Sequence, residues 1–330
     1  MKKTKRLLKT TIATLPSNSM PHQSHSSHSP QHNSPRLVCV GYGNMARAML
    51  SGIIESKLFI EYEILIIGRD LQKAQSLCDD LMHANSTGKN PASKNSTNEK
   101  LTNENPTHAL LQAICLDSHT PLDIEGCEVL LCVKPHALGV FTYTGKAHIV
   151  YSVMAGVRVD TIARAMSAQS FVRIMPNVGA LYGKSASCVY IHTASDTDSV
   201  DMCDIQSAVR RLVESFGNCV IVDNESLIDA SIATSGSAPA FLAVVAQSLI
   251  DSGIYHGLNY AQSAELVAQT FSGFAALLEH KTPDEIKISI TSPAGTTARG
   301  LAALERNGVR GAFIEAGVES VKRAKELGDS

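Results

Sequence analysis

The chain alternates regularly between apolar and amphipathic segments from Arg36 onward. Residues 36–43 form a continuous apolar run that ends in glycines, which is typical of a buried parallel strand followed by a tight turn. Residues 44–57 carry apolar side chains at helical spacing, so a helix is predicted there. The same two patterns predict a second strand over 63–68 and a second helix over 70–82.

A polar segment, residues 83–107, then interrupts this alternation. It is rich in Asn, Ser, Thr and Lys, and it has too few apolar residues to offset its ordering entropy. We therefore expect a mobile insertion. Further apolar runs predict strands at 128–133, 148–153, 171–175, 186–192 and 219–222. Because helical segments separate several of these strands, the pattern favours a parallel, doubly wound α/β sheet of Rossmann type over residues 36–222.

The second half of the chain lacks strand patterns after about Asp223. Its apolar positions recur at helical spacing, which predicts helices over 226–233, 237–256, 260–280, 293–306 and 309–327. The expected fold class is therefore α/β, with an N-terminal Rossmann-type doubly wound sheet followed by an all-helical domain over 223–330.

Composition narrows the classes of function and partner. The 330 residues are 44% apolar and 18% charged, with a net charge of −2, so neither nucleic acid nor a membrane surface is an expected partner. We find no apolar run of the roughly 20 residues that a membrane-spanning helix needs. The eight cysteines include no Cys-x-x-Cys pair, which predicts no metal site and free thiols in a cytoplasmic protein.

Residues 1–35 differ in character from the rest of the chain. Their basic start contains a short, interrupted apolar stretch without a clear cleavage site, and a segment rich in Ser and His follows. We expect a disordered tail.

The turn after the first predicted strand carries the first chemical motif. Residues 41–46, GYGNMA, have the pattern G-x-G-x-x-A, in which the first glycine permits a tight turn and the second lets a pyrophosphate approach the backbone. The following helix offers N–H groups and a positive dipole end to phosphates. We therefore expect a dinucleotide to contact Gly41, Tyr42, Gly43, Asn44 and Met45.

The end of the second predicted strand bears on the type of cofactor. An acidic residue there favours NAD, whereas an arginine favours the 2′-phosphate of NADP. The chain has Arg69 at this place, followed by Asp70, which suits the N-cap of the next helix. We expect NADPH to be preferred, with NADH as a possible cofactor; the alternative is that Arg69 is an ordinary solvated side chain.

Two later strand ends belong to the same predicted site, because ligands of such sheets bind outside the carboxyl ends of the strands. The first carries Lys134 and Pro135, for which an ordinary turn is an equal alternative. The second carries Val153, Met154 and Ala155.

A second candidate site begins at Ser292. The sequence SPAGTTA suits a helix start, with Ser292 as the N-cap and Pro293 in the first helical position. The free N–H groups and the hydroxyls of Thr296 and Thr297 would then form a site for a carboxylate at a positive dipole end. The alternative is an ordinary capped helix.

Taken together, these motifs resemble those of the pyrroline-5-carboxylate reductase family, in family order and over nearly all of residues 36–330. The most specific motif is the last. The shared motifs are GYGNMA (41–46), VKP (133–135), AGV (155–157), MPN (175–177), LIDA (227–230), SGSAPAF (235–241) and SPAGTTARGLAALERNGVR (292–310).

The resemblance implies an NAD(P)H-dependent oxidoreductase that reduces 1-pyrroline-5-carboxylate to L-proline, the last step of proline biosynthesis. It also implies that the helical domain dimerises, giving a homodimer or a higher homo-oligomer. Family cofactor contacts fall on the glycine turn, Lys134, Pro135 and residues 153–155. Family substrate contacts fall on Ala294, Gly295, Thr296 and Thr297, with Thr297 at the position of the catalytic hydroxyl.

The chain departs from the family pattern at a few positions. Ala294 and Ala238 occupy positions where the family usually has glycine. The pair Val178-Gly179 replaces a Thr-Pro pair, and Phe241 occupies a position where the family often has tyrosine. Three alternatives remain at this point: another imine reductase, a reductase like the β-hydroxyacid dehydrogenases, and a non-catalytic Rossmann protein that senses NADP. Reductases like the β-hydroxyacid dehydrogenases normally place a catalytic lysine on the interdomain helix. Residues 237–256 contain no lysine, which counts against this alternative.

Overall fold

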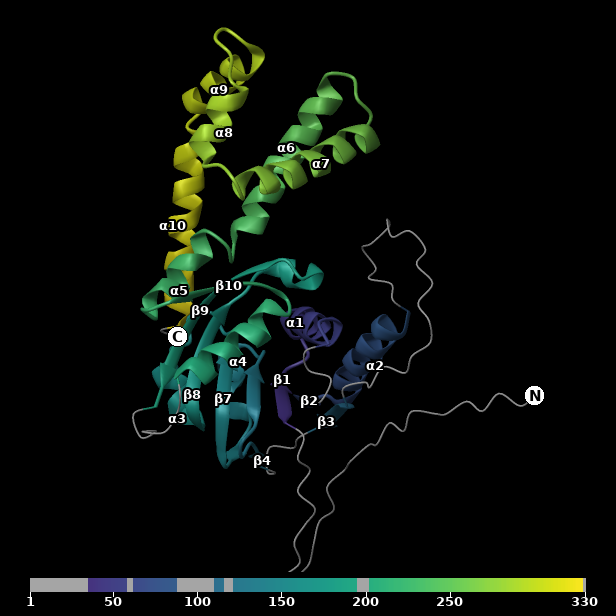
Figure 1. The fold of residues 1–330 in the computed structure, drawn as a ribbon, viewed down its shortest axis with the longest axis vertical. Helices are drawn as coiled ribbons and strands as arrows, with labels where there is room; N and C mark the ends of the chain where they lie inside the picture. Colours follow the sequence, from purple (N-terminus) through teal and green to yellow (C-terminus); the bar gives the residue numbers. More distant parts are fainter. Residues whose placement is uncertain (1–34, 58–61, 88–109, 116–120, 195–201, 329–330) are drawn as a thin grey trace, which may run out of the picture. The chain divides into compact units, whose positions relative to one another are not determined.

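The computed structural model describes residues 35–57, 62–87, 110–115, 121–194 and 202–328, which divide into two compact units (Figure 1). The first unit takes in the chain up to Ser231 together with the residues from Ala324 onward. The second unit is Ile232–Arg323. The tail expected at the N-terminus lies outside the described residues except for Pro35.

The first unit is built on an eight-stranded sheet in the order β10-β9-β8-β7-β5-β1-β2-β3. All neighbouring strands run parallel except β8 and β9, which are antiparallel. The strands are β1 (Arg36–Val40), β2 (Glu63–Gly68), β3 (Leu110–Cys115), β5 (Glu128–Leu131), β7 (Lys146–Ser152), β8 (Ser167–Met175), β9 (Ser185–Thr193) and β10 (Gly217–Val222), and a separate pair joins β4 (Leu122–Asp123) to β6 (Tyr143–Thr144). The predicted Rossmann-type doubly wound sheet is confirmed.

The antiparallel strand follows from the length of its connection. Only residues 176–184 lie between β8 and β9, and they include the 3-10 helix η2 (Val178–Tyr182). A parallel crossover needs a dozen or more residues, so this link can only reverse the chain. The apolar pattern carries no sign of this reversal, because β9 has the mostly apolar sequence that the parallel strands of this sheet also have.

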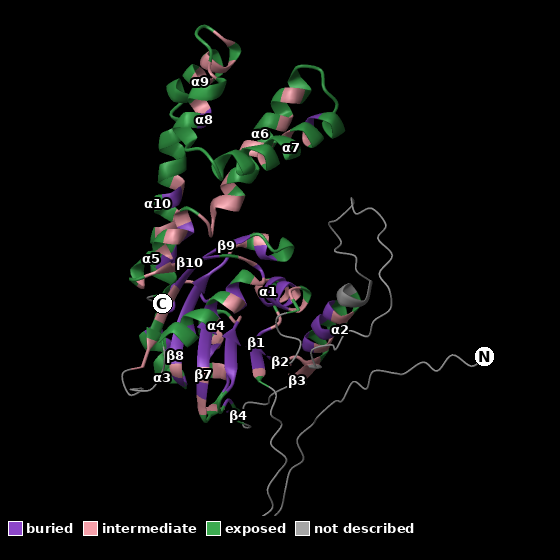
Figure 2. Cartoon of the chain, viewed as in Figure 1, coloured by how far each residue is buried: buried purple, intermediate pink, exposed green. Residues whose placement is uncertain are grey.

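Apolar side chains cover both faces of the sheet. The central strands are accordingly coloured as buried along much of their length (Figure 2). Leu37 and Cys39 pack into the core on one face, and Val38 and Val40 pack into the core on the other. All four side chains are fully buried, which explains why this strand is a continuous apolar run.

Helices of the first unit cover both faces of the sheet. The first face packs against α1 (Asn44–Glu55), α2 (Leu71–Thr87) and α4 (Met202–Glu214), and the second packs against α3 (Val159–Ala165) and the 3-10 helix η1 (Pro135–Val140). A short helix, α5 (Ser226–Ala230), contacts β8 and β9. The domain boundary that we expected at residue 223 therefore falls inside the first unit.

Two segments near the predicted insertion differ from the prediction. Helix α2 continues past residue 82 to Thr87, because nothing in 83–87 breaks a helix before Gly88. The remainder of the expected insertion, up to residue 107, lies outside the described residues. Strand β3 follows at Leu110 and was not predicted, since its short apolar run directly adjoins the polar segment.

The second unit is helical, as predicted. It contains α6 (Ala238–Tyr255), α7 (Tyr260–Leu278), α8 (Pro283–Ile290), α9 (Thr296–Arg306) and most of α10 (Val309–Gly328). Helix α8 was not predicted, although its signal is present. Thr282 and Glu285 form a capping box with Pro283 in the first turn, a pattern that marks a helix start.

Helix α6 has an unusual surface for an isolated chain. Most of its residues are apolar, and none of its residues is buried. The segment Ser226–Tyr255, which is interrupted by a turn at 234–237, is long and apolar enough to cross a membrane by length and composition, and 11% of its most apolar 18-residue stretch is buried. A helix of this kind also suits a protein–protein interface, so its composition alone does not distinguish the two.

Candidate functional site

The glycine turn after β1 has a backbone that only glycine can adopt at its first position. Gly41 has a φ of +115°, and a Cβ there would lie 2.5 Å from the carbonyl oxygen of Cys132. Its N–H donates to the carbonyl of Ile67, at 2.8 Å, and the N–H of Cys132 donates to that of Val40, also at 2.8 Å. The turn is therefore fixed between the ends of β2 and β5.

The second glycine of the motif opens onto free space. Gly43 is the N-cap of α1, has no side-chain cap, and a Cβ there would meet no atom within 4 Å. The first helical hydrogen bond runs from Arg47 N–H to the Gly43 carbonyl at 3.0 Å. The N–H groups of Asn44 and Met45 thus precede the intrahelical bonds, which suits the approach of a phosphate.

A pocket of about 240 Å³ lies at this edge of the sheet. It collects residues from the ends of β1, β2 and β5, including five of the predicted cofactor contacts: Gly41, Tyr42, Gly43, Arg69 and Lys134. Two of these are cations, and none of the described residues that line the pocket is a carboxylate. The arrangement suits a multiply charged anion such as a dinucleotide.

The side of the pocket at β2 is shaped by Tyr42. Its ring packs so closely on Gly68 that a Cβ there would overlap the ring. The neighbouring carboxylate of Asp70 accepts from the N–H of Lys73 at 3.1 Å and pairs with the ammonium of Lys73 at 3.1 Å. These contacts lower the pKa of Asp70. Asp70 is thus the predicted N-cap, and Arg69 is the charged pocket residue at this strand end.

Sequence reasoning missed several residues that line the same pocket. They are Ile67, Gly68, Cys132, Val133, His136, Ala137 and Phe141. The signal for Gly68 was its place at a strand end beside the glycine turn. Ile67 precedes it on β2, and the others lie after the end of β5, on η1 or at its C-cap, which the local pattern did not bring together.

Other predicted cofactor residues lie at the same sheet edge but outside this pocket's lining. Pro135 is the first residue of η1. Val153, Met154 and Ala155 follow β7, which is the neighbour of β5 in the sheet. Met154 is buried, and its N–H donates to Ser152 Oγ at 3.3 Å.

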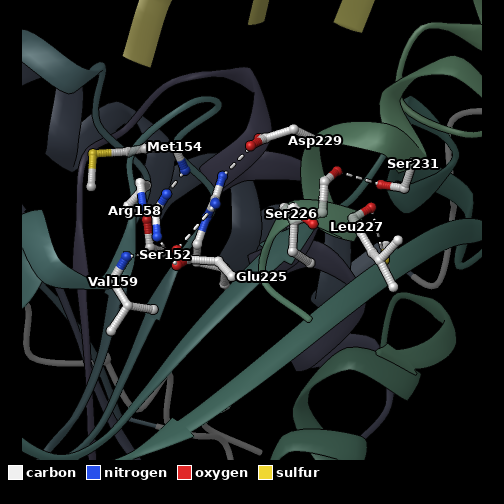
Figure 3. A network of polar contacts seen from close by, with 12 residues as sticks. Ser152, Met154, Arg158, Val159, Glu225, Ser226, Leu227, Asp229 and Ser231 are labelled. Atoms are coloured by element: carbon white, nitrogen blue, oxygen red, sulfur yellow. Dashed lines mark hydrogen bonds and ion pairs between the residues drawn. The ribbon is translucent and has the colours of Figure 1, made fainter. Parts of the chain in front are cut away.

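A buried ionic network adjoins this end of β7, and the sequence analysis did not predict it (Figure 3). Arg173 on β8 stands opposite Ser152 in the sheet, and its side chain is 2% exposed. Its guanidinium donates to Glu225 Oε1 at 3.2 Å and to Asp229 Oδ1 at 2.9 Å. Glu225 Oε1 also accepts from the N–H of Val159, the first residue of α3, at 2.7 Å. The network therefore connects β8, α3 and α5.

The predicted substrate segment lies in the second unit and differs in detail from the prediction. Residues 292–295 form a turn in which the Gly295 N–H donates to the Ser292 carbonyl at 3.1 Å. Ala294 has a φ of +61°, and Pro293 precedes it, as in a type II turn. The N-cap of α9 is Gly295. The prediction that Ser292 caps the helix and Pro293 opens it was therefore wrong.

Thr296 and Thr297 are the first two residues of α9, which has no acidic residue in its first turn. The first helical bond, from Arg299 N–H to the Gly295 carbonyl, measures 3.2 Å, so the N–H groups of both threonines precede the intrahelical bonds. Thr297 is half-buried, whereas Thr296 and Ala294 are exposed. The geometry of this helix start suits an anion.

We also searched the described residues for clusters of metal ligands. Within the described ranges, no group of three or more His, Cys, Asp and Glu side chains could hold a metal ion.

Comparison with known families gives two matches, one to the beginning of the first unit and one that covers the second unit. The family model for pyrroline-5-carboxylate reductase dimerisation matches residues 225–327. A model described as NADP oxidoreductase, coenzyme F420-dependent, matches residues 36–104.

Comparison with individual proteins points the same way. The pyrroline-5-carboxylate reductase of Helicobacter pylori strain J99 is 38% identical over 88% of this chain and 98% of its own length. That of Thermus thermophilus is 29% identical over 89% of this chain and 99% of its own.

Solved structures share the fold. The 1-pyrroline-5-carboxylate reductase of Streptococcus pyogenes superposes with a TM-score of 0.66 at 22% identity, covering 88% of this chain and 98% of that one. The Plasmodium falciparum pyrroline carboxylate reductase, solved with NADP bound, gives 0.64 at 21% identity, covering 90% and 98%.

Proposed function

The chain belongs to the pyrroline-5-carboxylate reductase family, and from this premise we propose how its residues reduce 1-pyrroline-5-carboxylate to L-proline with NAD(P)H, the last step of proline biosynthesis. The observation that carries the proposal is that one chain holds both halves of the chemistry. A dinucleotide turn is built into the first unit, and an anion-accepting helix start is built into the second.

The cofactor half rests on the pocket at the edge of the sheet. The pyrophosphate would be held by the N–H groups of the turn that follow Gly41, up to Met45, because the Gly41 N–H itself donates to Ile67, and Lys134 would add a positive charge. When bound, the nicotinamide supplies the hydride that reduces the C=N carbon. Pro135 and the segment Val153–Ala155 form the remaining wall at the adjoining strand ends.

Arg69 sets the preference for NADPH over NADH in this proposal. Its guanidinium binds the 2′-phosphate as a bidentate donor, while the neighbouring Asp70 is held by Lys73 and does not accept from the ribose. Arg69→Ala should lower the ratio of kcat/KM for NADPH to that for NADH by about tenfold or more, as losing a charge-assisted pair predicts. An unchanged ratio would remove Arg69 from this role.

The substrate half rests on the start of α9. The turn at Ala294 and Gly295 brings the N–H groups of Thr296 and Thr297 together, and these donate to the substrate carboxylate. The hydroxyl of Thr297 donates to the imine nitrogen, which takes a proton as the carbon is reduced. These residues therefore bind and orient the substrate. Orientation of the substrate accounts for most of what they contribute to the rate acceleration.

The role of Thr297 is tested by removing and restoring its hydroxyl. Thr297→Ala should lower kcat/KM for 1-pyrroline-5-carboxylate by about tenfold to a thousandfold, the range for an oriented hydrogen bond or general acid. Thr297→Ser keeps the hydroxyl and should recover most of the activity. Wild-type kcat/KM in Thr297→Ala would exclude Thr297 from the mechanism.

The match to a dimerisation family means that the second unit mediates homo-oligomerisation. We propose that the basic assembly is a homodimer, in which the apolar surfaces of α6 and α7 are covered by the second copy. We also propose a cytoplasmic protein that binds neither nucleic acid nor membrane. The apolar character of Ser226–Tyr255 is accounted for by this interface.

A further inference from the structure

The turn after β7 packs against the C-terminal end of the last helix, α10. Residues Met154–Val157 form this turn, and Ala155 and Gly156 occupy its centre. The turn overlaps the segment Val153–Ala155, which we assign to the cofactor, so its proposed role rests on that proposed function. Both the turn and residues 324–328 of α10 belong to the first unit.

The contact between the turn and the helix is made by two glycine backbones. Gly156 has a φ of +76°, and a Cβ there would lie 2.6 Å from the Ala324 carbonyl oxygen and 2.7 Å from the Gly328 nitrogen. Conversely, a Cβ on Gly328 would overlap the Gly156 carbonyl oxygen and lie 2.8 Å from its carbonyl carbon. No side chain larger than hydrogen fits at either position, so the two backbones are in direct contact.

The spacing of the contact residues gives α10 a defined face. Ala324 and Gly328 are four residues apart and therefore lie on the same side of the helix. Ala324 is 5% exposed, whereas residues 325–328 are exposed as whole residues. On the other side of the contact, Met154 and Val157 are buried in the first unit. The helix end therefore packs on the turn through a narrow strip of small residues.

We propose that this strip of Ala324 and Gly328 is a positioning element for the cofactor, because it fixes the backbone of the turn after β7. Glycine at a positive φ leaves the turn conformationally free on its own, so the helix behind it sets its geometry. The helix is continuous with residues of the second unit, up to Arg323, but the element itself needs only its last turn.

The test compares two glycines of the same helix. Gly328→Ala should raise the Kd for NADPH about three- to tenfold, measured by fluorescence titration without substrate, and raise the KM for NADPH similarly. The kcat at saturating NADPH should stay within twofold, because the residues assigned to the chemistry are unchanged. Gly311→Ala, where a Cβ would meet no atom within 4 Å, should leave Kd and KM unaltered.

A second pair of variants keeps the inference falsifiable if Gly328→Ala merely unwinds the last turn. A chain ending at Arg323 lacks the whole strip and should show the same rise in Kd, whereas a chain lacking only residues 329–330 should bind as the wild type does. If Gly328→Ala and the longer truncation lower Tm but leave Kd and KM for NADPH within twofold, the strip is only structural and the inference is overturned. If the wild type itself fails to bind NADPH, the proposed function fails and the inference with it.

Discussion

At the scale of single residues, Ala294 combines two features. It replaces the glycine that is usual in the family, and its backbone is strained. Its φ of +61° lies in the left-handed region, which costs a residue with a Cβ about 1–2 kcal/mol. The turn places this residue directly before the N-cap of α9, so the strain adjoins the proposed carboxylate site. The glycine usual in the family would avoid it.

Ala294→Gly should therefore raise the free energy of unfolding by about 1 kcal/mol, because relief of the left-handed strain exceeds the added entropy of the unfolded chain. Ala302→Gly is the matched control, since Ala302 is exposed within α9. That control should lose roughly 0.5–1 kcal/mol, the usual effect of glycine inside a helix. Denaturant unfolding of both variants checks the prediction, and equal losses in the two would contradict it.

The cysteines give a second prediction at this scale. Burial raises the pKa of the Cys78 thiol to about 12 and that of Cys219 to about 11, so both remain protonated and unreactive at pH 8. Cys203 is exposed on α4. Iodoacetamide at pH 8, followed by peptide mass spectrometry, should label Cys203 at least about tenfold faster than Cys78 or Cys219, and in urea the three rates should converge. Rapid labelling of Cys78 in the folded protein would contradict this prediction, because it would mean that the thiol is accessible to the reagent.

At the scale of elements, the Arg173 network joins β8, α3 and α5 through one buried guanidinium. Both of its carboxylate partners are only 14% exposed, so removing the cation would leave two nearly buried negative charges without it. Breaking a buried pair in this way typically costs about 3–5 kcal/mol.

We expect Arg173→Met to lower the free energy of unfolding by about 3–5 kcal/mol. The triple variant that also carries Glu225→Gln and Asp229→Asn should recover part of this loss, because it removes the two carboxylate charges that lose Arg173, of which Glu225 keeps another cation, Arg158 at 3.7 Å. Arg36→Met serves as the control, since Arg36 pairs with Glu63 at a side-chain exposure of 39% and should cost no more than about 1 kcal/mol. Similar losses in Arg173→Met and Arg36→Met would contradict the account.

The same elements show how far sequence reasoning reached. Strand β1 and its glycine turn were predictable because burial on both faces and a fixed turn chemistry leave a local pattern. The start of α9 was misplaced because Ser-Pro suits both an N-cap and the first half of a type II turn, and only the φ of Ala294 distinguishes them. Arg173 was missed because its partners are more than 50 residues away along the chain.

At the scale of the whole molecule, the second unit exposes many large apolar side chains. On α6 and α7 they include Leu242, Val244, Leu249, Leu266 and Phe274. A monomer rarely exposes so many large apolar side chains on neighbouring helices to water, and the region lies inside the match to the dimerisation family. The fold of this unit is therefore expected to depend on assembly.

Val244→Asp should weaken the proposed homodimer about tenfold or more, because a carboxylate without a partner would be buried at the interface. Val244 is 64% exposed in the single chain. Val220→Asp is the control, since Val220 is 54% exposed on β10 and lies outside the dimerisation match. Light scattering across a dilution series should show dissociation in the first variant only. Equal assembly of both variants would place the interface elsewhere.

The most direct test of the central claim is NADPH consumption by the full chain with 1-pyrroline-5-carboxylate as the only acceptor, with the product followed by mass spectrometry. The account predicts one L-proline formed for each NADPH consumed, together with negligible oxidation of a panel of β-hydroxyacids by NADP⁺. It would be contradicted if pyrroline-5-carboxylate failed to stimulate NADPH consumption, or if a hydroxyacid were turned over with a higher kcat/KM.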